Sequence, residues 1–268
     1  MNALPFEFCD SVISAIDHIR PLRELVPKLC PRYCKTWKAV IEDHLSNRRV
    51  TNIYLGCNDH DTLEFLKSVK KKYLRIYQVT WSGGHLSKID LDLLQFVKQF
   101  GQSSALNLIN RDGSPTSEEK ERLAEYLKNI SFTNITLNQP CEAVICHQAQ
   151  SKILTRLILD GEGWSKEMQP VIEEILLTNP IEYANICSDF VFRKDFMENL
   201  FDASCFTSTR KEFEIYTENL EEFRHFRPNL LVKQNSDRVV WRRDDGVWVT
   251  MYFMSYGAIC FGFLKSSD

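Results

Sequence analysis

Three short segments of the chain share one alternating pattern, and each of them ends in a turn. Apolar residues occupy every second position, as expected of a strand that buries one face. Turn residues and then a helical pattern follow each segment. The segments are residues 51–55, 133–137 and 155–159. A strand, a turn and a helix that recur along a chain are typical of stacked-repeat architectures.

Weaker copies of the same pattern fall between these segments, at residues 74–79, 105–109 and 183–187. If their central apolar residues are equivalent, the successive steps are 23, 30, 29, 22 and 29 residues, for Ile53, Ile76, Leu106, Ile135, Leu157 and Ile186. These steps are close to the roughly 20–29 residues of leucine-rich repeats, but they are irregular. We therefore predict an α/β fold, an irregular leucine-rich-repeat-like array of parallel strands and helices over residues 48–206.

Helix starts can be placed within this array from capping residues. Asp59 precedes a helical pattern that ends near residue 69, and Ser87 with Asp90 begins another that ends near residue 100. Thr116 and Glu119 form a capping-box pattern before a third helix. Residues 192–200 carry the last helical pattern of the array.

The pattern changes after residue 206. Residues 211–226 are charged, and their aromatic and apolar residues are spaced as one helical face, so we predict a helix there. Four strand-like segments follow, at residues 230–232, 239–243, 247–253 and 259–264, with a hairpin turn at residues 244–246. Trp241 and Trp248 fall on the two central segments, where we expect core packing. We predict that residues 207–268 form a helix and an antiparallel β meander packed on the array.

The first 47 residues contain no strand pattern. They predict three short helices, which begin near Pro5, Pro21 and Pro31. Three helices of this length are too small to bury a stable core alone, so we expect them to pack on the array. One interpretation is a helical cap that covers the first strand edge of the array.

The same residues carry a resemblance. Leu4-Pro5-x-Glu7-Phe8, the apolar positions from Val12 to Ile16, Leu22 and Leu25, and then Cys34-Lys35-x-Trp37 with Val40-Ile41 resemble an F-box. The whole layout is similar to the nematode-expanded families of F-box-associated proteins. The resemblance implies a three-helix head that docks on the Skp-type adaptor of a cullin-RING (SCF-type) ubiquitin ligase, while the remainder of the chain captures an unknown protein substrate. The adaptor-binding residues it implies are Leu4, Pro5, Phe8, Val12, Ile13, Leu22 and Trp37. The cap and the docking head both remain open interpretations.

Strand residues that point away from the helices would form an exposed face of the array. If side chains alternate along each strand, the residues of this face are polar or aromatic with one exception. They are Asn52, Tyr54, Arg75, Tyr77, Asn107, Asn134, Thr136, Arg156 and Ile158. Such a rigid extended surface is typical of a protein-binding face, although a merely solvated face has the same pattern.

Composition limits the class of function. The chain has 268 residues, of which 44% are hydrophobic, and a net charge of −3 from 33 basic and 36 acidic residues. This balance provides no positive field for nucleic acid or anionic membranes, and no apolar run is long enough to span a bilayer. The N-terminus lacks a secretion pattern, and Asn2 excludes myristoylation. We expect an intracellular, reducing location, cytoplasmic or nuclear, with the nine scattered cysteines free.

No motif predicts catalysis. Cys30 with Cys34, and Cys141 with Cys146-His147, lack the paired spacing of a zinc site, so we expect neither metal nor cofactor. Residues 161–163 lack the remaining residues of a phosphate loop, and no nucleophile elbow is present. An enzyme would require Cys146-His147 or His85 to act with a partner that the sequence does not place. We therefore predict a non-catalytic protein-interaction adaptor. The F-box resemblance implies that it is the substrate-recognition subunit of a ubiquitin ligase, and a stand-alone binding scaffold is the alternative.

Overall fold

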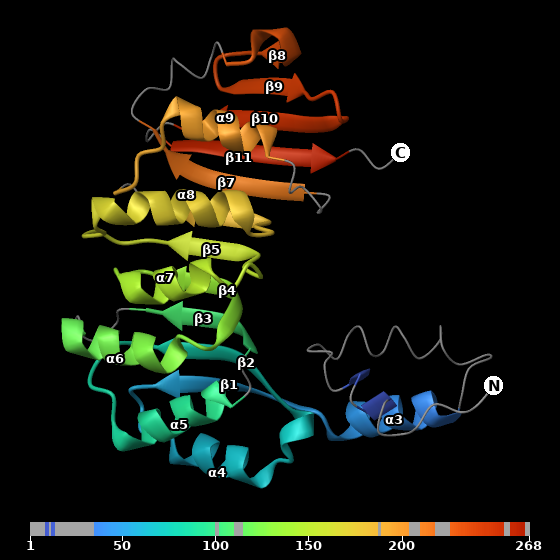
Figure 1. Cartoon of the computed structure of the whole chain (residues 1–268), viewed down its shortest axis with the longest axis vertical. Coiled ribbons are helices and arrows are strands. Elements are labelled where there is room, and N and C mark those ends of the chain that lie inside the picture. Colours follow the sequence, from blue (N-terminus) through green and yellow to red (C-terminus); the bar gives the residue numbers. More distant parts are fainter. Residues whose placement is uncertain are drawn as a thin grey trace.

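The computed structural model describes residues 9–10, 12–13, 35–99, 102–109, 115–186, 189–203, 210–217, 226–254 and 258–265. The fold is mixed α/β, and all described strands belong to one sheet of 11 strands. Figure 1 shows the strands stacked along the long axis of the molecule, with helix α3 (Lys35–Asn47) beside the first strands. The expected helices that begin near Pro5 and Pro21 lie almost wholly outside the described residues.

Seven strands pair in parallel and in chain order. They are β1 (Arg49–Leu55), β2 (Leu74–Trp81), β3 (Gln102–Leu108), β4 (Ser131–Leu137), β5 (Arg156–Leu159), β6 (Tyr183–Ile186) and β7 (Arg210–Tyr216). The helices between them are α4 (His60–Ser68), α5 (Lys88–Lys98), α6 (Ser117–Leu127), α7 (Glu142–Ala149), α8 (Gln169–Thr178) and α9 (Lys194–Asp202), with short 3₁₀ turns η1 (Lys71–Tyr73) and η2 (Lys166–Met168).

The helices α4 to α9 cover one face of this sheet. Each of them packs against the next, as Figure 1 shows. Right-handed crossovers between parallel neighbours in chain order place every connecting helix on the same side. The apolar residues of the strands face these helices in a single core, and the opposite face of the sheet carries the partly exposed residues.

The strand register corrects two of the predicted anchors. The residues that lie side by side on the helix-covered face are Ile53, Val79, Leu106, Ile135, Leu157, Ala184 and Phe213, which are 26, 27, 29, 22, 27 and 29 residues apart. Ile76 instead pairs with Thr51, before a bulge in the β1–β2 ladder, and Ile186 pairs with Leu159. Alternation alone did not reveal the bulge, which shifts the pattern by one residue.

The predicted helix at residues 211–226 is wrong where the structure describes it. Residues 210–216 form β7, which is parallel to β6 and antiparallel to β11 (Ala258–Lys265). Phe213 and Ile215 are buried, while Glu212 and Glu214, which alternate with them, are only partly buried. Burial of every second side chain and pairing with two neighbouring strands therefore decide the structure here, although the spacing of Phe213 and Tyr216 also fits a helix. The rest of the predicted helix, residues 218–225, lies outside the described residues.

The predicted antiparallel meander is confirmed. Beyond η3 (Pro228–Leu230), the strands are β8 (Leu231–Gln234), β9 (Arg238–Arg242), β10 (Val247–Phe253) and β11, in the sheet order β7-β11-β10-β9-β8. Trp241 is buried as predicted, with its ring edge-on to Phe201 of α9, and its Nε1 donates to the Phe226 carbonyl at 2.8 Å. The core of the meander is continuous with that of the array.

The N-terminal segment has a small core of its own. Helix α3 (Lys35–Asn47) contributes Val40 and Ile41, which pack with Cys9 and Ile13. Trp37 is partly buried against this cluster. The predicted third head helix therefore begins at Lys35 within the described residues, four residues after Pro31.

Polar contacts join this head to the array, at η1. The Lys72 Nζ donates to Asp10 Oδ1 at 3.1 Å and lies 3.7 Å from Asp43 Oδ2. The Tyr73 hydroxyl donates to the same Asp43 oxygen at 2.5 Å. Charge-assisted hydrogen bonds from η1 to the carboxylates of two head residues thus fix the head relative to the first repeat of the array.

His44 lies at the centre of this joint and is fully buried. Arg48 donates to its Nδ1 at 3.2 Å, so the ring must be neutral, with Nε2 donating to Asp10 Oδ1 at 3.0 Å. Burial lowers the pKa of His44 below its ordinary 6.5, and the charges of Arg48 and Lys72 add to this effect against the opposing influence of Asp10.

A second polar tie links neighbouring repeats. Asp90 of α5 is fully buried and completes a capping box with Ser87, whose backbone N and Oγ donate to Asp90 Oδ2 at 2.8 and 2.6 Å. Its other oxygen accepts from the Gly56 backbone N, in the turn after β1, at 2.8 Å. The helix start and the preceding turn are therefore held by one carboxylate. The predicted starts of α4, α5 and α6 are all confirmed by their caps.

We expect His44 to make the stability of the fold depend on pH. The unfolded chain takes up the His44 proton near pH 6.5, whereas the folded chain does so only at lower pH. The stabilisation is therefore complete above about pH 6.5 and declines as the pH falls toward the folded pKa. Urea unfolding at pH 7 and pH 5 measures how much the free energy of unfolding falls between these two values. This decrease should be smaller for His44→Gln than for the wild type. His60→Gln, an exposed site, should keep the wild-type loss, and equal losses in all three proteins would contradict this prediction.

We expect Asp90→Ala to lower the free energy of unfolding by about 3 kcal/mol, because buried donors lose a charged acceptor. Glu119→Ala is the matched control, since Glu119 completes the same capping box with Thr116 on an exposed helix start. Its expected cost is about 1 kcal/mol. Urea unfolding measures both variants, and equal costs would refute the role assigned to burial.

Candidate binding face

The sheet face opposite the helices carries two rows of side chains that cross the strands in register. One row runs from β1 to β9 as Asn52, Gln78, Ala105, Asn134, Arg156, Tyr183, Glu212, Gly262, Thr250 and Val240. The neighbouring row is Tyr54, Thr80, Asn107, Thr136, Ile158, Asn185, Glu214, Cys260, Tyr252 and Arg238. We call these two rows the open face.

The structure places seven of the nine residues predicted for this surface in the two rows. They are Asn52, Tyr54, Asn107, Asn134, Thr136, Arg156 and Ile158. Arg75 pairs with Val50, upstream of both rows. Tyr77 is the extra residue of the β1–β2 bulge and is 45% exposed, so Gln78 and Thr80 take the in-register positions. That these residues bind a partner stays a prediction.

Sequence reasoning missed the C-terminal half of the open face. Tyr183, Asn185, Glu212, Glu214 and the facing residues of β9 to β11 were not assigned to it. Residues 211–216 were expected to be helical, so the prediction lacked strand β7, which joins the array to the meander. The alternation of Glu212 and Glu214 with Phe213 and Ile215 was the signal that could have placed them.

Three arginines of the open side of the sheet stack on aromatic rings of the adjacent strand. The guanidinium carbon of Arg156 lies 4.5 Å from the ring centre of Tyr183, and that of Arg238 lies 5.3 Å from Tyr252. Arg242 lies 5.5 Å from the ring centre of Trp248. All three are in-register cross-strand pairs.

The third pair corrects the prediction for Trp248. This ring was expected in the core, but alternation along β10 places it on the opposite face from Val247 and Val249, which are buried. It is only partly buried there, beneath the arginine.

A hollow lies on this surface over β7, β11, β10 and β9. It has a volume of about 280 Å³ and forms around Gly262, which has no side chain to fill it. Glu212, Thr250, Tyr252 and Arg238 contribute to its lining. Glu212 accepts a contact from Cys260 Sγ at 3.6 Å, and Glu214 accepts from Asn185 Nδ2 at 2.9 Å.

Only three of the seven residues implied for adaptor binding lie among the described residues. Leu4, Pro5, Phe8 and Leu22 lie outside the described residues. Val12 is 39% exposed on the head, whereas Ile13 is 1% exposed and belongs to the small head core. Trp37 is partly buried against that core.

The candidate catalytic residues of the sequence have partners other than one another where a contact is found: Cys146 Sγ contacts Met168 Sδ at 3.8 Å, and the Nδ1 of His147 is buried without a hydrogen-bond partner in the described part of the chain. The His85 side chain is 81% exposed and pairs through Nδ1 with Glu119 Oε1 at 3.1 Å. Burial raises the pKa of both thiols of the cysteine cluster, that of Cys141 to about 11, which favours the protonated thiol over the nucleophilic thiolate. Among the described residues, no three His, Cys, Asp or Glu side chains are placed to share a metal ion. None of the described helices has both the length and the apolar character needed to cross a bilayer.

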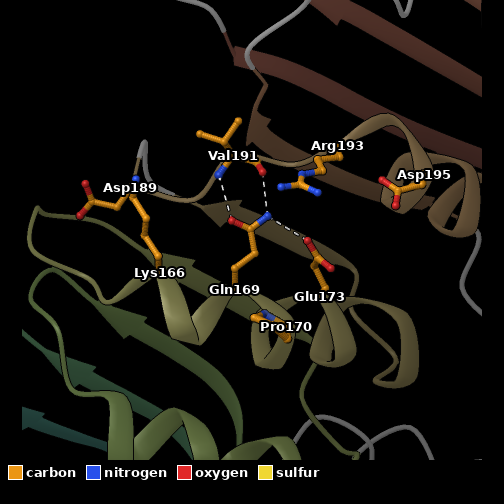
Figure 2. A pocket seen from close by; sticks show the side chains of 8 residues that line it. All are labelled: Lys166, Gln169, Pro170, Glu173, Asp189, Val191, Arg193 and Asp195. Carbon is orange, nitrogen blue, oxygen red and sulfur yellow. Dashed lines mark hydrogen bonds between the residues drawn. The ribbon is translucent and has the colours of Figure 1, made fainter.

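A second cavity, of about 470 Å³, lies between α8 and the segment before α9 (Figure 2). The Gln169 Nε2 donates to the Val191 carbonyl at 2.7 Å and to Glu173 Oε1 at 2.9 Å, while its Oε1 accepts from the Val191 N at 3.3 Å. The side-chain amide thus pairs with the backbone as a neighbouring strand would. We assign Gln169 a structural role in holding this segment.

Comparison with known proteins identifies no family. No family model matches the chain, and no curated protein matches it. One solved structure, the C-terminal domain of a candidate chitinase from Desulfitobacterium hafniense DCB-2, is 12% identical, with 82% of this chain and 87% of that chain covered, at a TM-score of 0.23. A likeness this weak supports no statement about fold or function.

We expect Gln169→Leu to lower the free energy of unfolding by about 2 kcal/mol, because the Val191 N–H and carbonyl lose their partners. Hydrogen exchange at the Val191 amide should become faster. Glu173→Gln keeps an oxygen that accepts from Gln169, and it should change the free energy of unfolding by less than about 0.5 kcal/mol. Unchanged exchange at Val191 in Gln169→Leu would disprove the structural role.

Proposed function

We propose that this chain is a non-catalytic protein-interaction subunit that captures a protein through the open face. The observation that carries the proposal is that no described helix covers this face, although ten strands of the 11-stranded sheet form it. A sheet buried on one side and paired along its length is rigid, so binding there costs little ordering entropy. In this respect the parallel part of the sheet resembles leucine-rich arrays, which bind proteins on extended surfaces.

The composition of the open side of the sheet supports protein binding. Tyrosine, tryptophan and arginine are enriched in the centres of protein interfaces. Tyr54 and Tyr252 are exposed, and three arginines are held against aromatic rings. These are large side chains whose conformations are already restricted before a partner arrives.

We further propose that the head docks on the Skp-type adaptor of a cullin-RING ubiquitin ligase. The Leu4-Pro5 and Cys34-Lys35-x-Trp37 motifs and the exposed apolar side chain of Val12 support this proposal. The joint through Lys72, Asp10 and Asp43 would then hold the open face at a fixed position relative to the ligase. A captured protein would be presented to the ubiquitin-transfer machinery in one orientation.

Co-purification of the intact chain with a Skp-type adaptor tests the docking. We expect a stoichiometric complex with the wild type and at least a tenfold loss with Val12→Glu, because a charge would enter an apolar contact. The double variant Leu4→Ala, Pro5→Ala should also lose binding. Val50→Glu is the matched control, since Val50 is 48% exposed on β1 and belongs to neither motif.

Circular dichroism should show that every variant keeps the wild-type fold. Adaptor binding by the wild type that survives Val12→Glu would contradict the assigned docking residue. Failure of the wild type to bind would exclude the ubiquitin-ligase part of the proposal and leave the open face as that of a stand-alone scaffold.

A further inference from the structure

Strand β1 forms one edge of the sheet, and its outer side is unpaired. Figure 1 shows β1 at the end of the stack opposite the meander, and β2 is its only neighbour among the described strands. An edge strand presents a row of backbone N–H and C=O groups that point away from the sheet. No described backbone group pairs with this row, although the Thr51 hydroxyl donates to the Asn52 carbonyl at 3.3 Å. The edge of β1 can therefore accept a further strand.

The opposite edge, strand β8, has features that obstruct such pairing. It has four residues, its Val232 is skipped in the register with β9, and Lys233 places a charge on it. Short strands, bulges and lysines protect the edges of sheets from further strands. By contrast, β1 has seven residues and neither proline nor lysine, and the extra residue of its irregular pairing, Tyr77, belongs to β2. Of the two edges, β1 is the one without such protection.

Two apolar side chains of β1 are exposed on the open side of the sheet. Val50 and Tyr54 are 48% and 44% exposed, and both point to this side because they are four residues apart. On the other side of the strand, Ile53 and Leu55 are fully buried. Directly opposite side chains of paired strands contact each other, and aromatic and β-branched residues pair favourably. An added strand with two apolar residues four positions apart would cover both exposed side chains.

Arg49 is the only charged residue of β1. It is exposed at the start of the strand, and no ion pair joins it to a described acidic residue. Its Nη1 donates to the carbonyls of Ser46 and Arg48, both at 3.1 Å, which holds the guanidinium at this end of the edge. The other N–H groups of a guanidinium can still donate to a carboxylate. An added strand with an acidic residue at this end is therefore complementary in charge.

We propose that the edge of β1 binds an extended segment of a partner protein as an additional, antiparallel strand. Antiparallel pairing is slightly more stable per residue than parallel pairing. In this direction the segment has the pattern apolar-x-x-x-apolar-acidic, with its first residue opposite Tyr54, its fifth opposite Val50 and its sixth opposite Arg49. Backbone hydrogen bonds supply the affinity, and the side chains supply the specificity. The inference goes beyond the proposed function, because the backbone of the sheet edge makes the contact.

A phage library of random peptides, panned on the intact, immobilised chain, tests the pattern. We expect the pattern to be enriched at least about tenfold over its frequency in the input library. Enrichment should fall to background on the double variant Val50→Ala, Tyr54→Ala. The matched control is Tyr252→Ala, Leu264→Ala, since these side chains are 41% and 54% exposed on β10 and β11, which are paired on both sides.

The contact with Arg49 is tested separately from the apolar contacts. We expect Arg49→Gln to lose the preference for an acidic residue at the sixth position and to keep the apolar preferences at the first and fifth positions. Arg49→Lys keeps the positive charge and should retain the acidic preference. Circular dichroism should show a wild-type fold for every variant.

Backbone pairing is tested with the most enriched peptide, resynthesised with one N-methyl group at a time. Successive amides of an added strand point alternately toward β1 and toward solvent. Affinity measured by fluorescence polarisation should therefore fall at least about tenfold at every second position and stay nearly constant at the positions between. Equal losses at all positions, or at none, would contradict a strand-like contact.

Absence of the pattern among the selected peptides would overturn the inference, as would equal enrichment on Val50→Ala, Tyr54→Ala. Sedimentation velocity should show a monomeric wild type. A dimer that this double variant dissociates would overturn the inference in favour of a second copy at the edge. Peptides that instead depend on Tyr252 and Leu264 would refute the edge site and leave the proposed function standing. Adaptor co-purification is measured separately, so failure of docking is distinguishable from failure of the edge contact.

Discussion

Burial of one side of every strand against the helices is the interaction on which the structure depends. The row from Ile53 to Phe213 lies in register across seven parallel strands and faces α4 to α9. A shift of any strand by one residue would turn its apolar side chains to solvent, so this row fixes the register of the whole ladder. It also determines what remains on the other side, because each buried residue leaves its two neighbours on the open face.

The polar ties act within this framework. Asp90 joins the turn after β1 to the start of α5, and Gln169 joins α8 to the segment before α9. Both satisfy backbone groups that the ladder and the helices leave unpaired. The joint around His44 has the same character at the N-terminal end, where a small helical core meets the first repeat. Hydrophobic burial thus sets the architecture, and buried polar groups fix its connections.

Much of the fold could be predicted from the sequence, for reasons that particular residues make clear. Asp59, Ser87 and Thr116 are local signals that cap helices regardless of tertiary context. The meander was predictable because its strands alternate and its turn contains Gly246, which has a φ of +83°. Strand β7 was not predictable in this way. Its identity depends on pairing with β6 and β11, which are separated from it in sequence, and its apolar spacing also fits a helix.

The candidate site was predictable only where the register was regular. One extra residue at Tyr77 moved Gln78 and Thr80 onto the open face, and a bulge of this kind leaves no clear mark in a sequence. The stacking of the arginines on aromatic rings could not be predicted from the sequence, for a different reason. Arg238 and Tyr252, or Arg242 and Trp248, are neighbours only through the hairpin register of β9 and β10. The electrostatic character of the surface therefore appears only after strand order is known.

The reversal of strand direction at β7 has a consequence for how such a molecule can change in evolution. A duplicated strand-helix unit inserted before β5 would lengthen the sheet and leave Arg156 and Arg238 at their present separation. The same unit inserted between β6 and β7 would separate Tyr183 from Tyr252 by one more strand, about 5 Å. Beyond β7 the ladder is antiparallel, so a parallel unit cannot propagate there without breaking the β7–β11 pairing. Duplication of a repeat near the N-terminal end of the array therefore leaves the spacing of the two arginines unchanged. Duplication toward the C-terminal end changes this spacing or breaks the strand pairing.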